Sequence, residues 1–236
     1  IFIPLYGLCF LTSERMSLVY ASLTLFFIMI YFAKFNKKVL IYFPLIILII
    51  TSSFYYLNVQ NFKFRVNDSY DQIFRPNHMH GMTFFSSQHE VYSRTSVELF
   101  KKEPILGIGP NNYRRKCHLV DLTDIGYEST ELLEFQFRDP ITCSTHPHNI
   151  FFQLLSETGS IGIIFYLIFI YYVFKEMFKF IFIRKYNNIN IFFLCPLIYY
   201  LNPLFPSGNF FNNWYMFMGI FSLPFYLYSI KIKKSV

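Results

Sequence analysis

Two arginines and one histidine lie in separate parts of the 236-residue sequence and could do chemistry together. Arg15 comes directly before a long apolar stretch, Arg94 lies in a polar segment, and His148 lies shortly before another apolar stretch. Arginine binds phosphate oxygens through parallel hydrogen bonds and keeps its charge. A neutral histidine can take a proton from a hydroxyl group. The three residues therefore suit a reaction in which a lipid-linked diphosphate leaves and an acceptor hydroxyl attacks.

Two more polar residues lie near His148 in the sequence. Pro147 favours the first position of a helix, which predicts that His148 lies in the first turn. The positive end of the helix dipole would keep that histidine neutral and available as a general base. His146 is less well placed, because the following proline favours an extended backbone. Glu157 could orient a histidine or pair with an arginine. The alternatives are that His148 caps or packs at the membrane interface and that Glu157 only marks the membrane boundary.

The arginines also have ordinary structural explanations. A charge at the end of a membrane helix can reach the interface at low cost, and Glu14 could pair with Arg15. Arg94 could be a solvated arginine paired with Glu90 or Glu98 at four-residue spacing in a helix. The functional interpretation therefore depends on whether topology brings the arginines and the histidine to one membrane face.

Composition predicts an all-α polytopic membrane protein. The sequence is 54% hydrophobic and 15% charged, whereas soluble domains have about 25% charged residues. About 20 apolar residues span a bilayer. The charge-free stretches are Met16–Ala33, Val39–Leu57, Thr158–Phe174 and Tyr186–Ile230. The last is long enough for two spans with a break near Pro203, which gives about five spans. The apolar Ile1–Leu11 stretch, which does not begin with Met, predicts a partial earlier span and a chain that is the C-terminal part of a longer protein.

The basic residues predict the orientation of these spans. The net charge of +7 comes from three basic clusters that flank the apolar runs: Lys34, Lys37 and Lys38; Lys175, Lys179, Arg184 and Lys185; Lys231, Lys233 and Lys234. Basic residues near span ends favour the cytoplasmic side. The excess positive charge therefore indicates the orientation of the spans and not a nucleic-acid partner. Residues 1–236 then form one membrane domain in which the segment 58–147 is a long periplasmic loop.

The same topology brings three short stretches to the outer membrane surface. They are Thr12–Arg15, His146–Asn149 and Pro206–Asn209. Arg15 and His148 are therefore expected to face the same compartment as the long loop.

The long loop is predicted to contain a short helix. Ser87 and Glu90 have the spacing of a capping box, and Val91, Thr95 and Leu99 then recur on one side of the helix. Pro104 ends this helix, and a turn follows over residues 105–110. A further helix is possible over residues 129–137.

The cysteines predict no metal site. Cys117 and Cys143 lie in the long loop and could pair if it is periplasmic. The sequence contains no CxxC or Cys/His metal spacing, so we predict no metal and no cofactor.

The stretches that hold these residues resemble one known family. They are Thr12–Arg15, Tyr92–Arg94, Lys102–Tyr113 and His146–Gly162. Together they are similar to the O-antigen ligase and O-antigen polymerase superfamily, over roughly residues 11–229. The most specific parts of the resemblance are Pro-Ile-Leu-Gly-Ile-Gly-Pro and the stretch from His-Pro-His-Asn to Gly-Ser-Ile-Gly.

The resemblance implies a metal-independent, inverting glycosyltransferase of the bacterial inner membrane, with its active site facing the periplasm. The donor would be a glycan on undecaprenyl diphosphate, and Arg15 and Arg94 would bind the diphosphate. His148 would be the catalytic base, and His146 and Glu157 would help to bind substrate. The acceptor would be lipid A core in a ligase, another lipid-linked glycan in a polymerase, or a protein hydroxyl in an O-oligosaccharyltransferase; the ligase is preferred.

Two other classes remain as alternatives at this point. A transporter of lipid-linked sugars would also use arginines against a diphosphate, but its binding site is expected near the bilayer midplane. A structural membrane subunit would tolerate alanine at Arg94 and His148.

Overall fold

The computed structural model describes residues 15–33, 36–57, 62–74, 86–120, 143–183 and 193–234, except residues 195 and 198. All regular structure in these ranges is helical, as predicted, and they contain no strand. The chain divides into two compact units, residues 1–72 and 73–236. Each unit is described by itself. Helix α4, Phe62–Phe74, includes the boundary between them.

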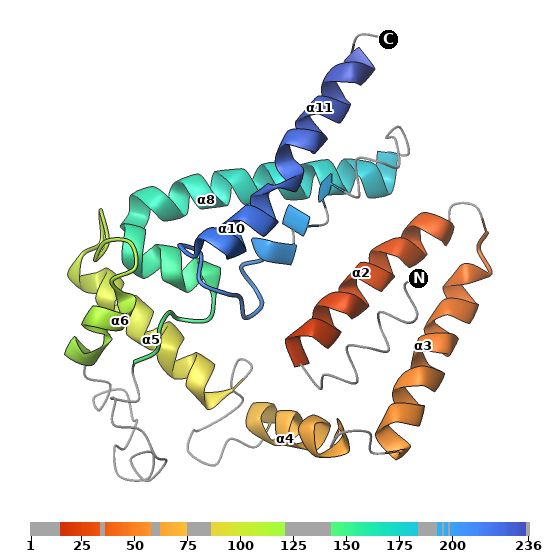
Figure 1. The fold of residues 1–236 in the computed structure, drawn as a ribbon, viewed down its shortest axis with the longest axis horizontal. Helices are drawn as coiled ribbons and strands as arrows, with labels where there is room; N and C mark the ends of the chain where they lie inside the picture. The colour runs from red at the N-terminus through yellow and green to blue at the C-terminus, as the bar shows by residue number, and fades with distance from the viewer. Residues whose placement is uncertain are drawn as a thin grey trace. The chain divides into compact units, whose positions relative to one another are not determined.

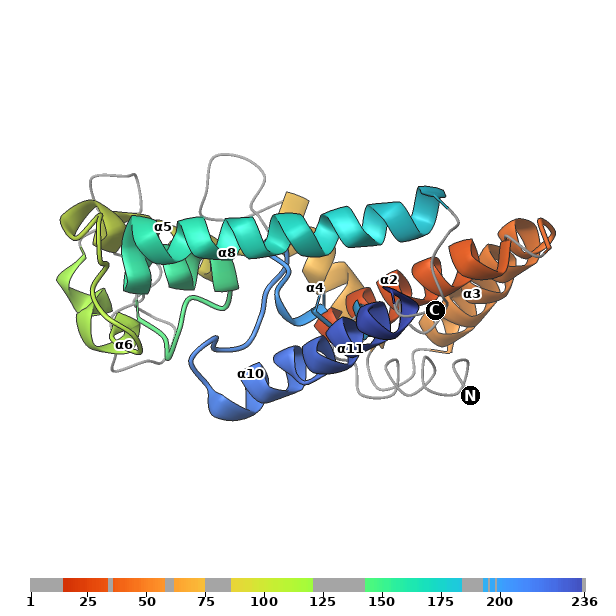
Figure 2. The same ribbon diagram turned by 90° about the horizontal axis from the view of Figure 1, so that it is seen from above.

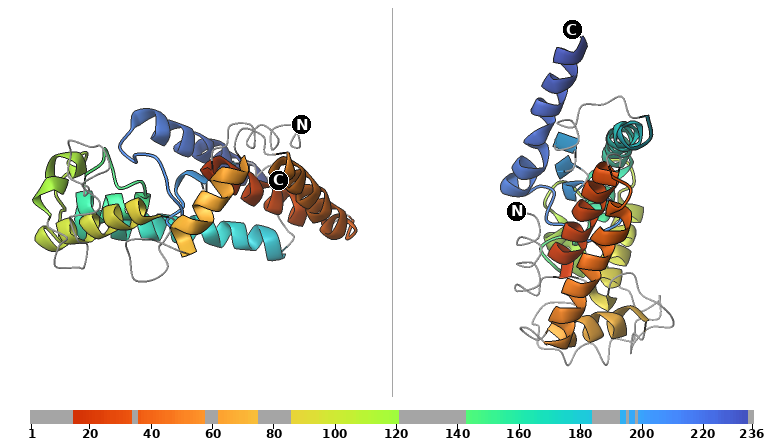
Figure 3. Two further views of the ribbon diagram at one scale, coloured as in Figure 1. Left: turned by 90° about the horizontal axis from the view of Figure 1, so that it is seen from below. Right: turned by 90° about the vertical axis from the view of Figure 1, so that its right-hand side faces the viewer.

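The first unit contains a hairpin of two apolar helices. Helix α2 is Arg15–Ala33 and helix α3 is Val39–Tyr56, and they lie side by side in Figures 1 and 3. Leu25 of α2 is buried against Phe43, Ile47 and other side chains of α3. Both helices match their predicted ranges to within one residue at each end.

The outer surface of α3 is suited to lipid rather than water. Ile41 and Leu48 are 68% and 62% exposed, and α3 has no buried residue. A water-facing surface of this kind would leave a large apolar area unburied. Helix α3 is one of two described helices that are long and apolar enough to cross a membrane, and the other lies within Ile150–Lys179. The prediction of five spans remains a prediction.

The second unit is built around helix α8, Ile150–Ile183, with helix α5, Ser87–Lys102, packed against its first part (Figures 1 and 2). Short helices α6, Tyr113–Lys116, and η2, Cys117–Leu119, follow α5. Helices α10, Asn213–Ile220, and α11, Ser222–Lys234, end the unit. The possible helix at 129–137 lies outside the described residues.

Helices α10 and α11 lie at the end of the charge-free stretch Tyr186–Ile230 and continue to Lys234. Phe221 between them keeps helical dihedral angles. Pro224 near the junction has no N–H to continue the hydrogen-bond ladder. Helix α11 is joined to α8 by the Tyr226 hydroxyl, which donates to Glu176 at 3.1 Å.

Helix α5 confirms the predicted buried face but corrects the predicted cap. Val91, Thr95 and Leu99 are at most 2% exposed. The N-cap is Ser86, one residue earlier than predicted, and its hydroxyl accepts from the His89 backbone N–H. Glu90 therefore does not close a capping box with Ser87. It pairs with Arg94 instead.

The start of α8 also differs from the prediction. The helix begins at Ile150, and the Asn149 side chain accepts from the backbone N–H groups of Phe151 and Phe152. Asparagine is a strong N-cap because its oxygen satisfies these otherwise unpaired donors. Pro147 and His148 thus precede the helix, and the prediction that His148 lies in its first turn was wrong.

Candidate functional site

A break in helix α8 positions the loop that follows α5. Gly159 has φ 62° and ψ −159°, so the helix cannot continue through it and changes direction (Figure 1). Backbone groups on both sides of the break bond to the loop. Ile108 N–H donates to the Ser156 carbonyl at 2.9 Å, and Ser160 N–H donates to the Pro104 carbonyl at 2.8 Å. The loop therefore satisfies backbone groups that the break would otherwise leave unpaired.

Glycine is required on both sides of this contact. A Cβ atom on Gly107 would lie 2.5 Å from the Glu157 carbonyl carbon, and one on Gly159 would lie 2.5 Å from the Ile105 carbonyl oxygen. Both glycines have positive φ angles, 68° and 62°, which favour glycine. Gly107 and Gly159 thus allow the loop to lie directly against the break in α8.

Glu157 and Gln153 tie the same part of α8 to two other segments. The Glu157 carboxylate is 1% exposed and accepts from the Tyr113 backbone N–H at 2.7 Å and from the Gln153 amide at 3.0 Å. The Gln153 amide also donates to Asn209, and its oxygen accepts from the Phe210 N–H. The observed contacts of Glu157 are therefore with its own helix and with backbone N–H groups at and just before the start of α6, and none involves a histidine or an arginine among the described residues.

A disulfide fixes the segment that holds the histidines. Cys117 of η2 is bonded to Cys143, with the Cα atoms 5.1 Å apart. Cys117 is fully buried against Val91, Leu99 and Tyr113. The disulfide anchors the start of the Cys143–Asn149 segment to the α5–α6 core. The structure thus contains the pairing that the sequence left open.

Reduction of this disulfide is expected to lower the free energy of unfolding by roughly 3 kcal/mol, because the bond closes a 26-residue loop. Thermal unfolding of the detergent-purified protein, with and without reductant, measures the effect. The matched control is the double variant Cys117→Ser, Cys143→Ser, which should be less stable and insensitive to reductant. A wild-type unfolding temperature that does not respond to complete reduction would contradict the prediction.

His148 lies where three segments meet. Its backbone is left-handed, with φ 54°, a conformation in which histidine is enriched among residues other than glycine. Its ring centroid is 4.2 Å from that of His146, 5.7 Å from that of Tyr92 and 5.9 Å from that of His89. Its Nε2 atom is 3.0 Å from the Ser144 hydroxyl, and its Nδ1 atom has no hydrogen bond to the described residues.

Burial keeps His148 neutral. Desolvation lowers the pKa of its imidazole below the ordinary value of 6.5. The predicted neutral histidine is therefore obtained, although by burial and not by a position in the first turn of a helix.

His146 uses both ring nitrogens in structural contacts. Nε2 is 3.3 Å from the Ser207 carbonyl oxygen, which can only accept, so this nitrogen carries the proton. Nδ1 is 2.9 Å from the Thr145 hydroxyl. Burial and the neighbouring His148 lower the pKa of His146 to about 4. His146 is therefore a neutral residue that holds the 206–209 turn.

The 206–209 turn is joined to the histidine segment, as the topology predicted for these two stretches. Ser207 N–H donates to the His148 carbonyl at 2.8 Å. The Asn149 amide donates to the carbonyl of Pro203 at 3.0 Å. The third stretch of that prediction, Thr12–Arg15, has only Arg15 among the described residues. Arg15 is the first residue of α2 in the first unit.

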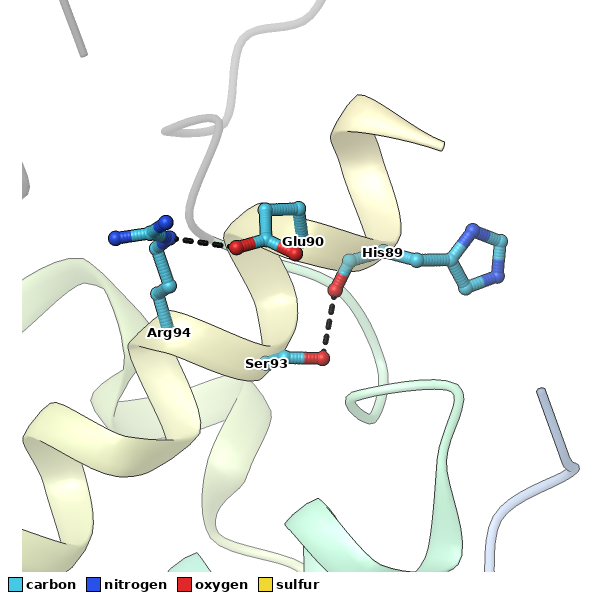
Figure 4. A network of polar contacts seen from close by, with 4 residues as sticks. All are labelled: His89, Glu90, Ser93 and Arg94. Atoms are coloured by element: carbon cyan, nitrogen blue, oxygen red, sulfur yellow. Dashed lines mark hydrogen bonds and ion pairs between the residues drawn. The ribbon is translucent and has the colours of Figure 1, made fainter. Parts of the chain in front are cut away.

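Arg94 points away from the His89 ring. Its Nε atom is 2.8 Å from Glu90 Oε1, and 43% of its side chain is exposed. Figure 4 shows Arg94 and Glu90 on one side of α5, while the His89 ring extends from the other. His148 is grouped with His146, and its described contacts do not include Arg94 or Glu157. Arg94 lies on a surface from which its guanidinium is accessible to a ligand.

Sequence reasoning missed three neighbours of His148: His89, Tyr92 and Ser144. His89 and Tyr92 are three residues apart, so they lie on one face of α5. That spacing was visible in the sequence, but nothing in it showed that this face meets the 143–149 segment. The described residues contain no group of three His, Cys, Asp or Glu side chains that could hold a metal ion.

One comparison with known proteins gives a match. A family model described as O-antigen ligase matches residues 1–167. The match includes the long loop, the histidine segment, Gly159 and the beginning of the second part of α8. No curated protein and no solved structure matches the chain.

Proposed function

Since the chain belongs to the O-antigen ligase family, we propose that it moves a glycan from undecaprenyl diphosphate to an acceptor hydroxyl. The family is one of membrane glycosyltransferases of the O-antigen ligase and polymerase type, and the two long apolar helices suit a membrane protein. The family match over 167 residues carries the proposal. The geometry around His148 supports its chemistry.

His148 is proposed to be the general base. Its imidazole is neutral, and Nδ1 is not engaged by the described residues, so its lone pair can accept the proton of the acceptor hydroxyl. Removal of that proton would make the acceptor oxygen a stronger nucleophile as it attacks the anomeric carbon. Attack opposite the leaving diphosphate would invert the anomeric centre.

Arg15 and Arg94 are proposed to bind the diphosphate. Negative charge grows on the leaving diphosphate as the glycosyl bond breaks, and guanidinium groups stabilise that charge without a metal ion. The exposure of Arg94 supports this role, since a ligand can reach it without unfolding α5. We therefore propose a metal-independent reaction with no cofactor.

The reaction is proposed to occur at the periplasmic face of a bacterial inner membrane. The three basic clusters orient the spans, and the Cys117–Cys143 disulfide suits an oxidising compartment. His146 and Glu157 are proposed to help bind substrate. Their observed hydrogen bonds are to neighbouring protein groups, which suits residues that hold the surrounding segments in place.

The acceptor distinguishes three versions of this function. Lipid A core would make the protein a ligase, which we favour because the matching family carries that description. A second lipid-linked glycan would make it a polymerase, and a protein hydroxyl would make it an O-oligosaccharyltransferase. The alternative from another class is a transporter of lipid-linked sugars.

Arg94→Ala is expected to lower glycan transfer about 100-fold, because one charge that stabilises the leaving diphosphate is lost. Transfer is measured in membranes that contain the full-length protein and purified undecaprenyl diphosphate glycan. The matched control is Glu90→Gln, which breaks the same ion pair and leaves the arginine. A solvent-exposed pair of this spacing contributes only about 0.3–0.5 kcal/mol. Equal losses in the two variants would mean that Arg94 serves only the helix.

A further inference from the structure

We infer that Ser144 is a positioning residue that holds His148 in the tautomer with the proton on Nε2. This inference rests on the proposed function and adds a residue to its site. It leaves the lone pair on Nδ1, where the acceptor hydroxyl can reach it.

The contact between the two side chains is direct. The Ser144 hydroxyl oxygen is 3.0 Å from His148 Nε2, within hydrogen-bond distance. The hydroxyl can accept from Nε2–H and still donate its own proton elsewhere. Nε2 has no other hydrogen bond to the described residues, so Ser144 is the group among them that selects the tautomer.

Tyr92 completes a chain of hydroxyl groups. Burial raises the pKa of the Tyr92 phenol, and an interaction with the Ser144 side chain opposes this rise. Tyr92 therefore stays protonated at neutral pH. If the Ser144 proton points to the Tyr92 oxygen, the serine lone pairs are turned toward Nε2–H. The ring of Tyr92 also lies beside the imidazole, with centroids 5.7 Å apart.

Proton transfer to His148 changes the bonds at the acceptor and at the imidazole. The O–H bond of the acceptor breaks and an N–H bond forms on Nδ1, while the electron pair left on oxygen attacks the anomeric carbon. His148 becomes an imidazolium ion. Its Nε2–H bond to Ser144 then becomes charge-assisted and stronger, which stabilises the transition state. A base oriented by a third group is the general arrangement for such proton transfers.

Among the residues that the structure describes, no carboxylate is in contact with the His148 ring. The titratable groups around its ring are His89 and Tyr92 of α5 and His146 of its own segment. Glu90 lies on the Arg94 side of α5, away from the His89 ring (Figure 4). Within this described part of the chain, the Ser144 hydroxyl is in the position that a carboxylate occupies in many base-orienting pairs.

The test is a kinetic comparison of Ser144→Ala with Ser144→Thr in the full-length protein. The alanine variant is expected to lose about 10- to 100-fold in kcat with little change in the donor KM, and threonine is expected to restore most of the loss. The control is Ser93→Ala, whose hydroxyl bonds only the His89 carbonyl within α5 among the described residues, at 2.8 Å. It should match wild type.

A second readout separates positioning from folding. Nitrogen NMR of histidine-labelled protein is expected to show His148 protonated on Nε2 in wild type and as a mixture of tautomers in Ser144→Ala. A wild-type kcat in Ser144→Ala, while His148→Ala is inactive, would overturn the inference. Activity in both variants would instead remove the proposed role of His148. If Ser144→Ala does not accumulate, Tyr92→Phe is the deciding variant, because it keeps the ring and removes the hydroxyl. A kcat lowered about 3- to 10-fold would support the inference, and an unchanged kcat would overturn it.

Discussion

His148→Ala is expected to lower glycan transfer by about 10²- to 10⁴-fold, the contribution typical of a general base. The variant should still insert into the membrane, because the His148 side chain is half-buried and its only described hydrogen bond is to Ser144. The measurement is the rate of glycan transfer in membranes with equal amounts of wild-type and variant protein.

The matched control is His146→Ala, which removes the same type of side chain two residues away. Both nitrogens of His146 are used in structural contacts, so its loss should cost less than about tenfold. A larger loss in His146→Ala than in His148→Ala would reverse the two roles.

The pH dependence provides a further check on the same residue. Because burial lowers the pKa of His148, its neutral, basic form persists below pH 6.5. The acidic limb of the wild-type profile should therefore lie below that value.

Gly159→Ala is expected to destabilise the second unit by about 3 kcal/mol or more. The φ of 62° and ψ of −159° lie in a region open essentially only to glycine, and a Cβ atom would meet the Ile105 carbonyl oxygen at 2.5 Å. Backbone strain and overpacking each cost about 1–3 kcal/mol. Thermal unfolding in detergent, together with the amount of folded protein in membranes, measures the effect.

Ser160→Ala is the control beside this glycine. It removes only the hydroxyl that donates to the Pro104 carbonyl at 2.7 Å, which should cost about 1 kcal/mol. If Gly159→Ala is as stable as Ser160→Ala, the docking of the 104–109 loop into the break of α8 is not a required feature of the fold.

The sequence predicted the elements that depend on local pattern. The apolar stretches gave α2 and α3 to within one residue at each end, and the four-residue spacing gave the buried face of α5. Both follow from the periodicity of a helix and from the length needed to cross a bilayer.

The helix starts were less predictable, because neighbouring residues compete for the cap. Two adjacent serines lie at the start of α5: the capping-box pattern predicts Ser87 as the cap, but Ser86 caps the helix and Ser87 is its first residue. Pro147 suits the first position of a helix, but Asn149 caps α8 and places Pro147 and His148 before it. A strong capping residue determined the start in each case.

The site itself could be predicted only in part, because its contacts are between residues far apart in the sequence. His148 was identified from its place in a motif, but Ser144 and Tyr92 were not, since their roles depend on α5 meeting the 143–149 segment. Gly107 and Gly159 lie in two different motifs, and their close approach is visible only in the folded structure. A pattern of residue types does not contain these distances.

The most direct test of the proposed function is whether the purified full-length protein breaks the bond between glycan and diphosphate. The protein is reconstituted in vesicles with undecaprenyl diphosphate glycan and one candidate acceptor at a time. We predict free undecaprenyl diphosphate and a matching amount of glycan on one acceptor, both lost in His148→Ala. Movement of the intact lipid-linked glycan across the vesicle membrane, with no free undecaprenyl diphosphate for any acceptor, would contradict a glycosyltransferase and favour a transporter.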